Sequence, residues 1–590
     1  MKNELLQLLR TRLKSLEGSV LPASLDVELL QLERTRDASH GDFACNIALR
    51  LAKSLGRKPR ELAAEIVAAI GEDPLIERIE IAGAGFINIF VSHQRYCEEL
   101  RQIHITGAQY GRHTLASPKK ILLEFVSANP TGPMHVGHGR QAAYGDALGK
   151  ILAAAGHEVF REYYINDAGR QTEILAVSVW LRYLERCGKL IKFPENGYRG
   201  DYLLPLAADL QARLGETLTC NAQALFDGLP PDAPEGNKDE HVDALILRCR
   251  QLIGEEAWQH LLSFSLEQML AEIRDDLAAF SIGFDRWTSE RAFAESGAIE
   301  HALDRLRARD LLYVKDGAEW FKATDFGDDE DRVVIRENGV KTYFASDIAY
   351  HLDKRERGFD LLIDVLGADH HGYVARLRGG LQAFGHPGDC LEVCLVQLVS
   401  LFRDGVKLSM GKREGNFVTL RQLREEVGND ACRIFYLMRS NDQALDFDLE
   451  LAKSKSNENP VFYVQYAHAR VASVLREIDA RALSYQADQA ATWLQTDGSN
   501  LLSGPHAEHL LKMASRYPEI IEQAAAQRAP HALVHYLREL ANALHSFYNA
   551  ERILVEDERL RHARVYALQA VQQVLRNGLA LLGAHAPDSM

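Results

Sequence analysis

Two histidines, His135 and His138, lie three residues apart where the sequence changes from a strand pattern to a helix pattern. Imidazoles at this spacing share one face of a helix. Near a helix N-terminus they can donate hydrogen bonds to phosphate oxygens, which the helix dipole also attracts. Gly137 between them has no side chain, so a ribose or a base can approach the backbone. The pattern indicates nucleotide binding, with an ordinary pair of surface histidines as the alternative.

The flanking segments predict the elements that such a site needs. The run from Ile121 to Val126 is apolar apart from Glu124 and predicts a buried strand. The next residues, up to Pro133, include two prolines and one glycine and predict a loop. A helix is expected from His135 to Ala155. Strand, loop and helix in this order form the junction at which an α/β sheet holds a nucleotide.

Two further segments bring polar residues to the same edge of the predicted sheet. Tyr343 and Asp347 are four residues apart and share a face if their segment is helical. Leu361 to Leu366 predicts a strand, and Gly367 and Asp369 follow it directly. A glycine there lets the backbone approach a ribose, and a carboxylate can accept hydrogen bonds from its hydroxyls.

A short basic segment follows a turn at Asp404. It carries Lys407, Lys412 and Arg413 together with two glycines. A cationic loop that can move suits a leaving group that gains negative charge during the reaction. The alternative is a solvated basic turn.

The string from Glu124 to His138, Glu-Phe-Val-Ser-Ala-Asn-Pro-Thr-Gly-Pro-Met-His-Val-Gly-His, resembles the first signature of class I aminoacyl-tRNA synthetases. Within that class it is similar to the arginyl-tRNA synthetases of bacterial type, and the resemblance extends over nearly the whole chain. It aligns Ser409 to Arg413 with the second class signature, Lys-Met-Ser-Lys-Ser. The first lysine of that signature is therefore serine here, its serine is glycine, and Lys407 upstream is a candidate substitute.

The resemblance implies roles for individual residues. The residues implied to be catalytic are His135, His138 and Lys412. The residues implied to bind ATP are Gly137, Gly367, Asp369, Met410 and Lys412. The residues implied to bind arginine are Glu124, Asn129, Tyr343 and Asp347. A guanidinium needs a planar carboxylate partner, and Asp347 suits that role.

Composition limits the alternatives. With 46% hydrophobic and 26% charged residues the chain is typical of a soluble globular protein. No apolar stretch is long enough to cross a membrane, and the charged N-terminus does not resemble a signal peptide. The scattered cysteines indicate neither a disulfide framework nor a zinc site, so a reducing cytoplasm is expected. The net charge of −15 argues against a nucleic-acid partner, but local basic faces can still bind phosphates.

The expected fold class is α/β and multidomain. A Rossmann-type parallel-sheet catalytic domain with helical insertions joins an N-terminal α+β domain to a C-terminal α-helical bundle. Arg332 to Ile335 is expected to be a strand of the catalytic domain, and the chain is expected to be helical from residue 421 to its end. The expected domains are 1–107, contacting tRNA; 115–420, catalytic, with an insertion at about 168–330; 421–455, linking helices; and 456–590, anticodon-binding.

The function that the resemblance implies is ATP-dependent activation of L-arginine and its transfer to the 2′-hydroxyl of the terminal adenosine of tRNA(Arg). ATP with Mg²⁺ is the expected substrate complex, with no tightly bound metal. The expected partners are tRNA(Arg), L-arginine and ATP, with no membrane, and the chain is expected to be a monomer. Two alternatives stay open: a small-molecule adenylyltransferase, and a catalytically weak synthetase-like tRNA-binding paralogue.

Overall fold

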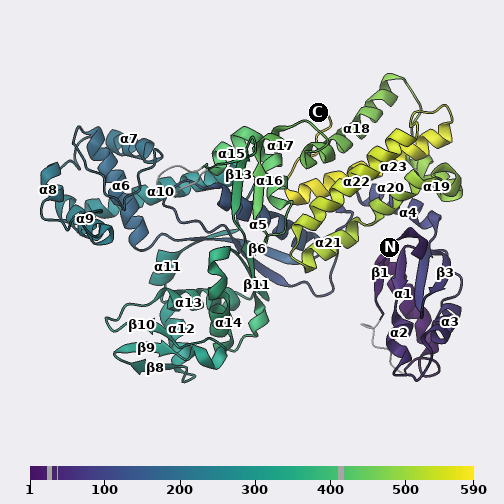
Figure 1. Cartoon of the computed structure of the whole chain (residues 1–590), viewed down its shortest axis with the longest axis horizontal. Coiled ribbons are helices and arrows are strands. Elements are labelled where there is room, and N and C mark those ends of the chain that lie inside the picture. Colours follow the sequence, from purple (N-terminus) through teal and green to yellow (C-terminus); the bar gives the residue numbers. More distant parts are fainter. Residues whose placement is uncertain (23–29, 36, 409–417) are drawn as a thin grey trace.

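The computed structural model describes residues 1–22, 30–35, 37–408 and 418–590. A parallel sheet lies near its centre, as Figure 1 shows. A helical lobe extends to the left of the sheet, the yellow C-terminal helices pack on the right, and the purple N-terminal lobe lies below them. The arrangement agrees with the expected α/β class with a helical C-terminal part.

The central sheet has five parallel strands in the order β12-β11-β5-β6-β7. They are β5 (Lys120–Phe125), β6 (Glu158–Ile165), β7 (Arg286–Ser289), β11 (Leu361–Gly367) and β12 (Leu391–Val396). The strands predicted at 121–126 and 361–366 are confirmed. They read as apolar runs because both faces of a parallel sheet are covered.

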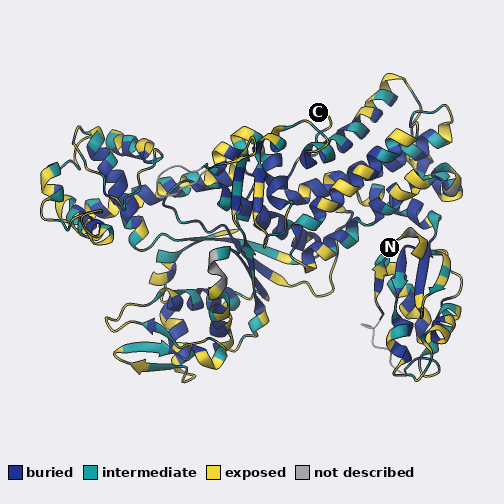
Figure 2. Cartoon of the chain, viewed as in Figure 1, coloured by how far each residue is buried: buried dark blue, intermediate teal, exposed yellow. Residues whose placement is uncertain are grey.

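The helix α5 (Val136–Ala154) follows β5 and confirms the helix expected from His135. It approaches the sheet closely because it carries glycines on its inner face. A Cβ atom on Gly145 would lie 2.3 Å from the Phe125 ring, and one on Gly149 would lie 3.2 Å from Leu123. Figure 2 shows α5 and the central strands mainly in the colour of buried residues. The loop between β5 and α5 is therefore held by two buried elements.

The chain then leaves the sheet for a helical lobe. Its helices are α6 (Arg170–Arg186), α7 (Leu203–Leu214), α8 (Ala222–Phe226), α9 (Lys238–Ile253) and α10 (Glu255–Ala279). They enclose a core of their own around the fully buried Trp180 and Trp258. β7 lies inside the range expected as one insertion, yet it pairs with β6, so the chain returns to the sheet before leaving it again.

The second excursion contains α11 (Glu290–Glu295), α12 (Ala298–Arg307), β8 (Leu312–Lys315), β9 (Ala318–Phe321) and β10 (Arg332–Ile335). The predicted strand at 332–335 exists, but its assignment to the catalytic sheet is wrong. β10 pairs antiparallel with β9 in a separate three-stranded sheet. A four-residue apolar run shows that a strand is present but contains no information about its partner. The chain returns to the central sheet through α13 (Tyr343–Glu356), and α14 (Val374–Ala383) connects β11 to β12.

The N-terminal lobe is α+β. A four-stranded antiparallel sheet in the order β1-β2-β4-β3 packs with three helices. Its elements are α1 (Lys2–Leu13), β1 (Leu32–Arg34), β2 (Phe43–Cys45), α2 (Ile47–Ala52), α3 (Pro59–Ile70), β3 (Ile76–Ala82) and β4 (Phe86–Val91). The next helix, α4 (His93–Thr106), packs against the C-terminal helices.

The C-terminal part is helical with one exception. Its helices are α15 (Leu420–Val427), α16 (Asn429–Leu437), α17 (Leu449–Lys453), α18 (Pro460–Ala480), α19 (Ala487–Leu501), α20 (Pro505–Ser515), α21 (Tyr517–Ala526), α22 (Pro530–Ala550) and α23 (Glu558–Leu582). The exception corrects the expectation of unbroken helices: β15 (Leu445–Asp448) pairs in parallel with β13 (Val399–Arg403), which also pairs with β14 (Val406–Lys407). Leu445 and Phe447 alternate with acids, which suits a strand buried on one face.

A buried ion pair joins the catalytic part to the C-terminal helices. Arg433 in α16 pairs with Asp146 in α5, and neither side chain is exposed. The same guanidinium donates to the backbone carbonyls of Leu582 at 2.8 Å and Phe280 at 2.9 Å. The two parts therefore share one core. Among the helices of the described residues, none combines the length and apolar character that a membrane crossing needs.

Candidate active site

A cleft of about 1230 Å³ lies at the carboxyl edge of the central sheet. Residues that follow each of the five strands line it. Single-ligand pockets usually measure about 300–1,000 Å³, so the cleft has room for a nucleotide and an amino acid together. The sequence-predicted residues that line it are Glu124, Asn129, His135, Gly137, His138, Tyr343, Asp347 and Gly367. An open α/β sheet binds its ligands at this edge.

The two histidines cap the N-terminus of α5. Nδ1 of His135 accepts hydrogen bonds from the backbone N–H groups of Gly137 at 3.1 Å and His138 at 3.4 Å. The backbone N–H of His135 donates to Nδ1 of His138 at 3.3 Å, and the two rings stack with centroids 3.7 Å apart. Since Nδ1 accepts in both, each neutral ring carries its proton on Nε2. In this tautomer Nε2 is a donor, as phosphate binding requires.

The backbone between β5 and the cleft is strained. Val126 has φ 68° and Ser127 has φ 39°, both in the left-handed region that residues other than glycine rarely adopt. Ser127 is held there because its hydroxyl donates to Glu124 at 3.0 Å and accepts from the Tyr164 backbone N–H at 3.1 Å. Strain of this kind persists where surrounding contacts impose it, and it is common at functional sites.

Tyr343 and Asp347 lie on the first turns of α13, so their segment is helical. The Thr342 hydroxyl caps the helix by accepting from the Ala345 backbone N–H. Tyr343 is 72% exposed, whereas Asp347 is half-buried and accepts a hydrogen bond from the Tyr373 hydroxyl. Burial raises the pKa of Asp347, although the hydrogen bond from Tyr373 opposes that shift. A partly desolvated carboxylate in a cleft suits a cationic ligand.

Three buried acids stand side by side across the sheet. Asp364 on β11 is in register with Glu124 on β5, which is in register with Glu162 on β6. We call Asp364, Glu124 and Glu162 the carboxylate row. α13 and Arg357, the residue directly after it, cover the row with three basic residues. The first of these contacts is the ion pair of Arg357 with Glu162. Adjacent buried carboxylates repel one another, so the row requires these cations.

Lys354 and His351 neutralise the other two acids. The Lys354 ammonium donates to Glu124 at 2.6 Å and to Asp364 at 3.0 Å. His351 contacts the Asp364 carboxylate through Nε2 and the Asp347 backbone carbonyl through Nδ1, both at 2.7 Å. Three basic side chains thus face the three acids of the carboxylate row, and Asp347 is an additional carboxylate that lines the cleft.

The structure gives fewer contacts for the remaining predicted residues. The Asn129 side-chain amide donates to Gln171 at 2.8 Å. Gly367 ends β11 at the cleft, and Asp369 belongs to the short helix η6 (Ala368–Tyr373) that follows it. Two predicted ATP-site residues lie outside the described residues: Met410 and Lys412. Within the described residues no group of three or more potential ligands could hold a metal ion.

Glu290 is a cleft residue that the sequence analysis did not identify. It is the first residue of α11, directly after β7, and lines the cleft with Asp347. Burial, and then the negative charges of Asp347 and Asp167, raise the pKa of Glu290 to about 7. The available signal was an acid directly after a strand, but that strand lay within the range expected as an insertion.

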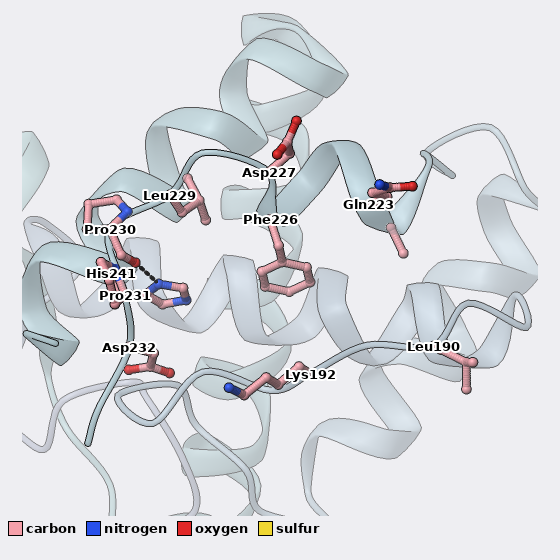
Figure 3. A pocket seen from close by; sticks show the side chains of 11 residues that line it. Leu190, Lys192, Gln223, Phe226, Asp227, Leu229, Pro230, Pro231, Asp232 and His241 are labelled. Carbon is pink, nitrogen blue, oxygen red and sulfur yellow. Dashed lines mark hydrogen bonds between the residues drawn. The ribbon is translucent and has the colours of Figure 1, made fainter. Parts of the chain in front are cut away.

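A second cavity, of about 500 Å³, lies in the helical lobe. Figure 3 shows its lining, with the His241 ring near Phe226 and hydrogen-bonded to the Pro230 backbone carbonyl at 2.7 Å. Two acids, Asp227 and Asp232, and one lysine also line it. None of the sequence-predicted site residues lies there, so the cleft at the sheet edge is the candidate active site.

Comparison with known proteins agrees with this geometry. Three family models match the chain in order: "Arginyl tRNA synthetase N terminal domain" over 3–91, "tRNA synthetases class I (R), catalytic domain" over 99–189 and 247–454, and "DALR anticodon binding domain" over 464–590. The chain belongs to the arginyl-tRNA synthetases. The catalytic model omits 190–246, a part of the helical lobe that contains α7 and α8.

Relatives among the arginyl-tRNA synthetases align over the full length. The arginine–tRNA ligase of Thioalkalivibrio sulfidiphilus is 50% identical over 592 residues and covers 100% of both chains. The arginine–tRNA ligase of Legionella pneumophila strain Paris is 50% identical over 585 residues, covering 99% of this chain and 98% of the relative. The arginyl-tRNA synthetase structure of Thermus thermophilus superposes with a TM-score of 0.74 at 22% identity, covering 100% of both chains, and shows the shared fold.

These matches confirm the family and the fold class that the sequence indicated. The activity of the chain is that of an arginine–tRNA ligase of class I. Neither alternative, the small-molecule adenylyltransferase or the weak paralogue, finds support in the comparisons. The domain boundaries and the roles of individual residues stay predictions.

Proposed function

We propose that this arginine–tRNA ligase binds ATP and L-arginine together in the cleft at the sheet edge. The N-terminus of α5 would hold the nucleotide, and the N-terminal turns of α13 would hold the amino acid. The observation that supports this division is that the stacked rings of His135 and His138 and the carboxylates of Asp347 and Glu290 line one cleft and come from different elements. Donors suit phosphate oxygens, and carboxylates suit a guanidinium.

At the nucleotide end, His135 and His138 donate from Nε2 to the phosphates of ATP, and Gly137 gives the nucleotide room. Gly367 and Asp369 contact the ribose, as the resemblance implies. Met410 and Lys412 complete the ATP site, with Lys412 and Mg²⁺ meeting the leaving pyrophosphate. Imidazole donors and cations of this kind stabilise charge that develops during phosphoryl chemistry.

At the amino-acid end, the guanidinium of arginine lies between Asp347 and Glu290. Burial, and then the negative charges of Asp347 and Asp167, raise the pKa of Glu290. A guanidinium bound between Glu290 and Asp347 would relieve the repulsion between these carboxylates. Tyr343 flanks the pocket, and Asn129 and Glu124 hold the α-amino group. Glu124 is the most constrained of these, since Lys354 and Ser127 already contact its two oxygens.

The chemistry proceeds in two steps and needs no protein nucleophile. A carboxylate oxygen of arginine attacks the α-phosphorus of ATP, which forms arginyl-adenylate and releases pyrophosphate. The 2′-hydroxyl of the terminal adenosine of tRNA(Arg) then attacks the acyl carbon and releases AMP. Positioning and electrostatic stabilisation supply the catalysis in both steps.

The tRNA would bind with its anticodon on the C-terminal helices. Tyr466 stacks near Phe462 and His545, with ring centroids 5.8 Å and 5.5 Å away, and the Arg470 guanidinium lies 4.7 Å from the Tyr466 ring centroid. Aromatic and guanidinium planes of this kind can stack on unpaired bases. The enzyme would act as a monomer in the cytoplasm.

An ATP–pyrophosphate exchange assay tests the proposal. Exchange is expected with arginine plus tRNA(Arg), and not with lysine or citrulline, which lack the planar cation. Tyr466→Ala should weaken tRNA binding and leave the arginine KM unchanged at saturating tRNA. Exchange with lysine as fast as with arginine would contradict the carboxylate pair, and unchanged tRNA binding by Tyr466→Ala would place the bases elsewhere.

A further inference from the structure

Lys354 is a charged residue that the two-step mechanism does not use. Its side chain is 0% exposed, beneath the cleft, on the face of α13 that covers the sheet. The ammonium contacts Glu124 at 2.6 Å and Asp364 at 3.0 Å, and it lies 4.4 Å from the Tyr350 ring centroid. A lysine is almost never buried to this extent unless it is paired, so these contacts explain why it is tolerated.

The charge of Lys354 favours the ionised form of Glu124. Burial and the negative charge of Asp364 favour the protonated form of Glu124, and the pKa of this carboxyl is raised despite the opposing effect of Lys354. Without the ammonium, Glu124 would hold its proton more tightly still. A protonated Glu124 would be neutral and would no longer attract the α-amino group of arginine.

Lys354 also fixes the position of α13. Asp347, His351 and Lys354 follow one another at spacings of four and three residues, which places them on one face of the helix. His351 and Lys354 both contact Asp364 on β11. The helix is therefore held to the sheet at two successive turns, and its first turns present Asp347 to the cleft.

We propose that Lys354 is a positioning residue for arginine, acting through Glu124 and Asp347 without touching the substrate. Its ammonium keeps Glu124 ionised and holds α13 at the distance from the sheet that the arginine pocket needs. The inference rests on the proposed function, because it takes Glu124 and Asp347 to be arginine ligands.

Steady-state exchange kinetics of Lys354→Met, at saturating tRNA, test the inference. Methionine keeps much of the volume of the lysine stem and removes the charge. The arginine KM is expected to rise by about tenfold or more, the scale of losing one hydrogen bond to a charged group, and the ATP KM is expected to change less than about twofold. Lys354→Arg keeps the charge and should restore the arginine KM to within about threefold of the wild type.

The pH profile separates this role from a merely structural one. The groups that face Glu124 are Lys354, His351 and Tyr350 from α13, Asp364 from β11, and Glu162 and Tyr164 from β6. With Lys354 replaced by methionine, we expect the pKa of Glu124 to rise further, so that more of this carboxyl ionises only as the pH rises. The ratio of variant to wild-type arginine KM should therefore fall with increasing pH.

A double variant tests whether Lys354 acts on arginine binding through Glu124. If Lys354 acts through Glu124, the arginine KM of Glu124→Gln/Lys354→Met should be well below the value expected from multiplying the two single effects. Multiplicative effects with a flat pH ratio would overturn the inference. If Lys354→Met does not fold, Lys354→Gln, whose amide can still donate to one carboxylate, provides the same measurements.

Arg95→Met is the matched control. Arg95 is a buried cation, 9% exposed, placed between Glu4 and Glu99, and it lies in α4 outside the cleft. Arg95→Met should lower the Tm of the protein and leave the arginine KM unchanged. If Lys354→Met lowered Tm in the same way with no change in arginine KM, Lys354 would be structural only. Asp347→Asn in the same series distinguishes a failure of this inference from a failure of the proposed function. If Asp347→Asn also leaves the arginine KM unchanged, the proposed function itself fails.

Discussion

The two ends of the cleft are built in different ways. At the α5 end, His135 and His138 are held by hydrogen bonds to backbone groups at most three residues away. At the α13 end, Lys354 contacts Glu124, which lies 230 residues away in the sequence. The histidine rings of the first end are oriented by near neighbours, although the His135 backbone also pairs with Thr419. The second end is assembled from buried charges on three strands and one helix.

This contrast indicates where the specificity for arginine resides. A phosphate group is common to many ligands, and one short motif at a helix N-terminus can bind it. A guanidinium must be distinguished from other cations, and this requires carboxylates fixed in position and charge. We therefore expect substitutions at the α13 end to change amino-acid choice, and those at the α5 end to change ATP use.

Asp347→Asn should give the largest effect at the α13 end. A guanidinium against a neutral amide loses a charge-assisted bidentate pair, about 2–4 kcal/mol, or about 30- to 1000-fold in kcat/KM for arginine. The ATP KM should change little, because ATP lies at the other end. Exchange kinetics at varied arginine and varied ATP measure both values. An unchanged arginine KM would remove Asp347 from the pocket.

Lys412→Ala should give the largest effect at the α5 end, about 10²-fold or more in adenylate formation, the scale of losing one preorganised charge contact. Lys407 is exposed at the end of β14, and Lys407→Ala should cost less, about tenfold, partly in the ATP KM. Single-turnover formation of adenylate measures both. A larger loss for Lys407→Ala would make Lys407 the catalytic cation and shift the alignment of the basic segment.

Much of the α5 end could be predicted from the sequence, because its determinants are contiguous. The strand, the loop, the helix and the two histidines on one face all follow from about thirty residues and from hydrogen bonds between near neighbours. The Tyr343–Asp347 pair on one helix could be predicted for the same reason. These structural interpretations depend on local sequence patterns, and the roles of the residues depend on the family resemblance.

The carboxylate row at the α13 end could not be predicted from the sequence, because it depends on which strands pair with one another. Glu124 is visible as a lone acid in an apolar run, and Asp364 has the same appearance in β11. Their adjacency follows from the register of β5 and β11, which periodicity does not determine. Glu290 was missed because β7 was not recognised as a strand of the central sheet, and β10 was assigned to the wrong sheet for the same reason.

Gly145→Ala tests how far the α5 end depends on the close contact of helix and sheet. The added Cβ would lie 2.3 Å from the Phe125 ring in a fully buried place, so α5 or the ring must move. Overpacking of this kind costs about 1–3 kcal/mol. Denaturant unfolding should show that loss, and the ATP KM should rise more than the arginine KM. An equal rise of both would mean that the two ends are not independent.

The smallest expected effect is a pH dependence of arginine binding. It distinguishes the two ends of the cleft, because it is expected at the α13 end alone. Glu290 has a pKa of about 7, raised by burial and by the charges of Asp347 and Asp167. Below that pH the carboxyl is protonated and offers no charge to a guanidinium, and above it the carboxylate attracts one. The arginine KM should therefore fall by up to about tenfold from about pH 6 to about pH 8 and then level off, while the ATP KM follows the ionisation of ATP alone.

Two variants test the assignment of this pH dependence to Glu290. Glu290→Gln should abolish the dependence on pH. Asp347→Asn removes one of the charges that raise the pKa of Glu290, so it should move the midpoint of the curve to lower pH. A midpoint that stays near 7 in Asp347→Asn would show that the two carboxylates do not interact, and the guanidinium would then have one partner instead of two.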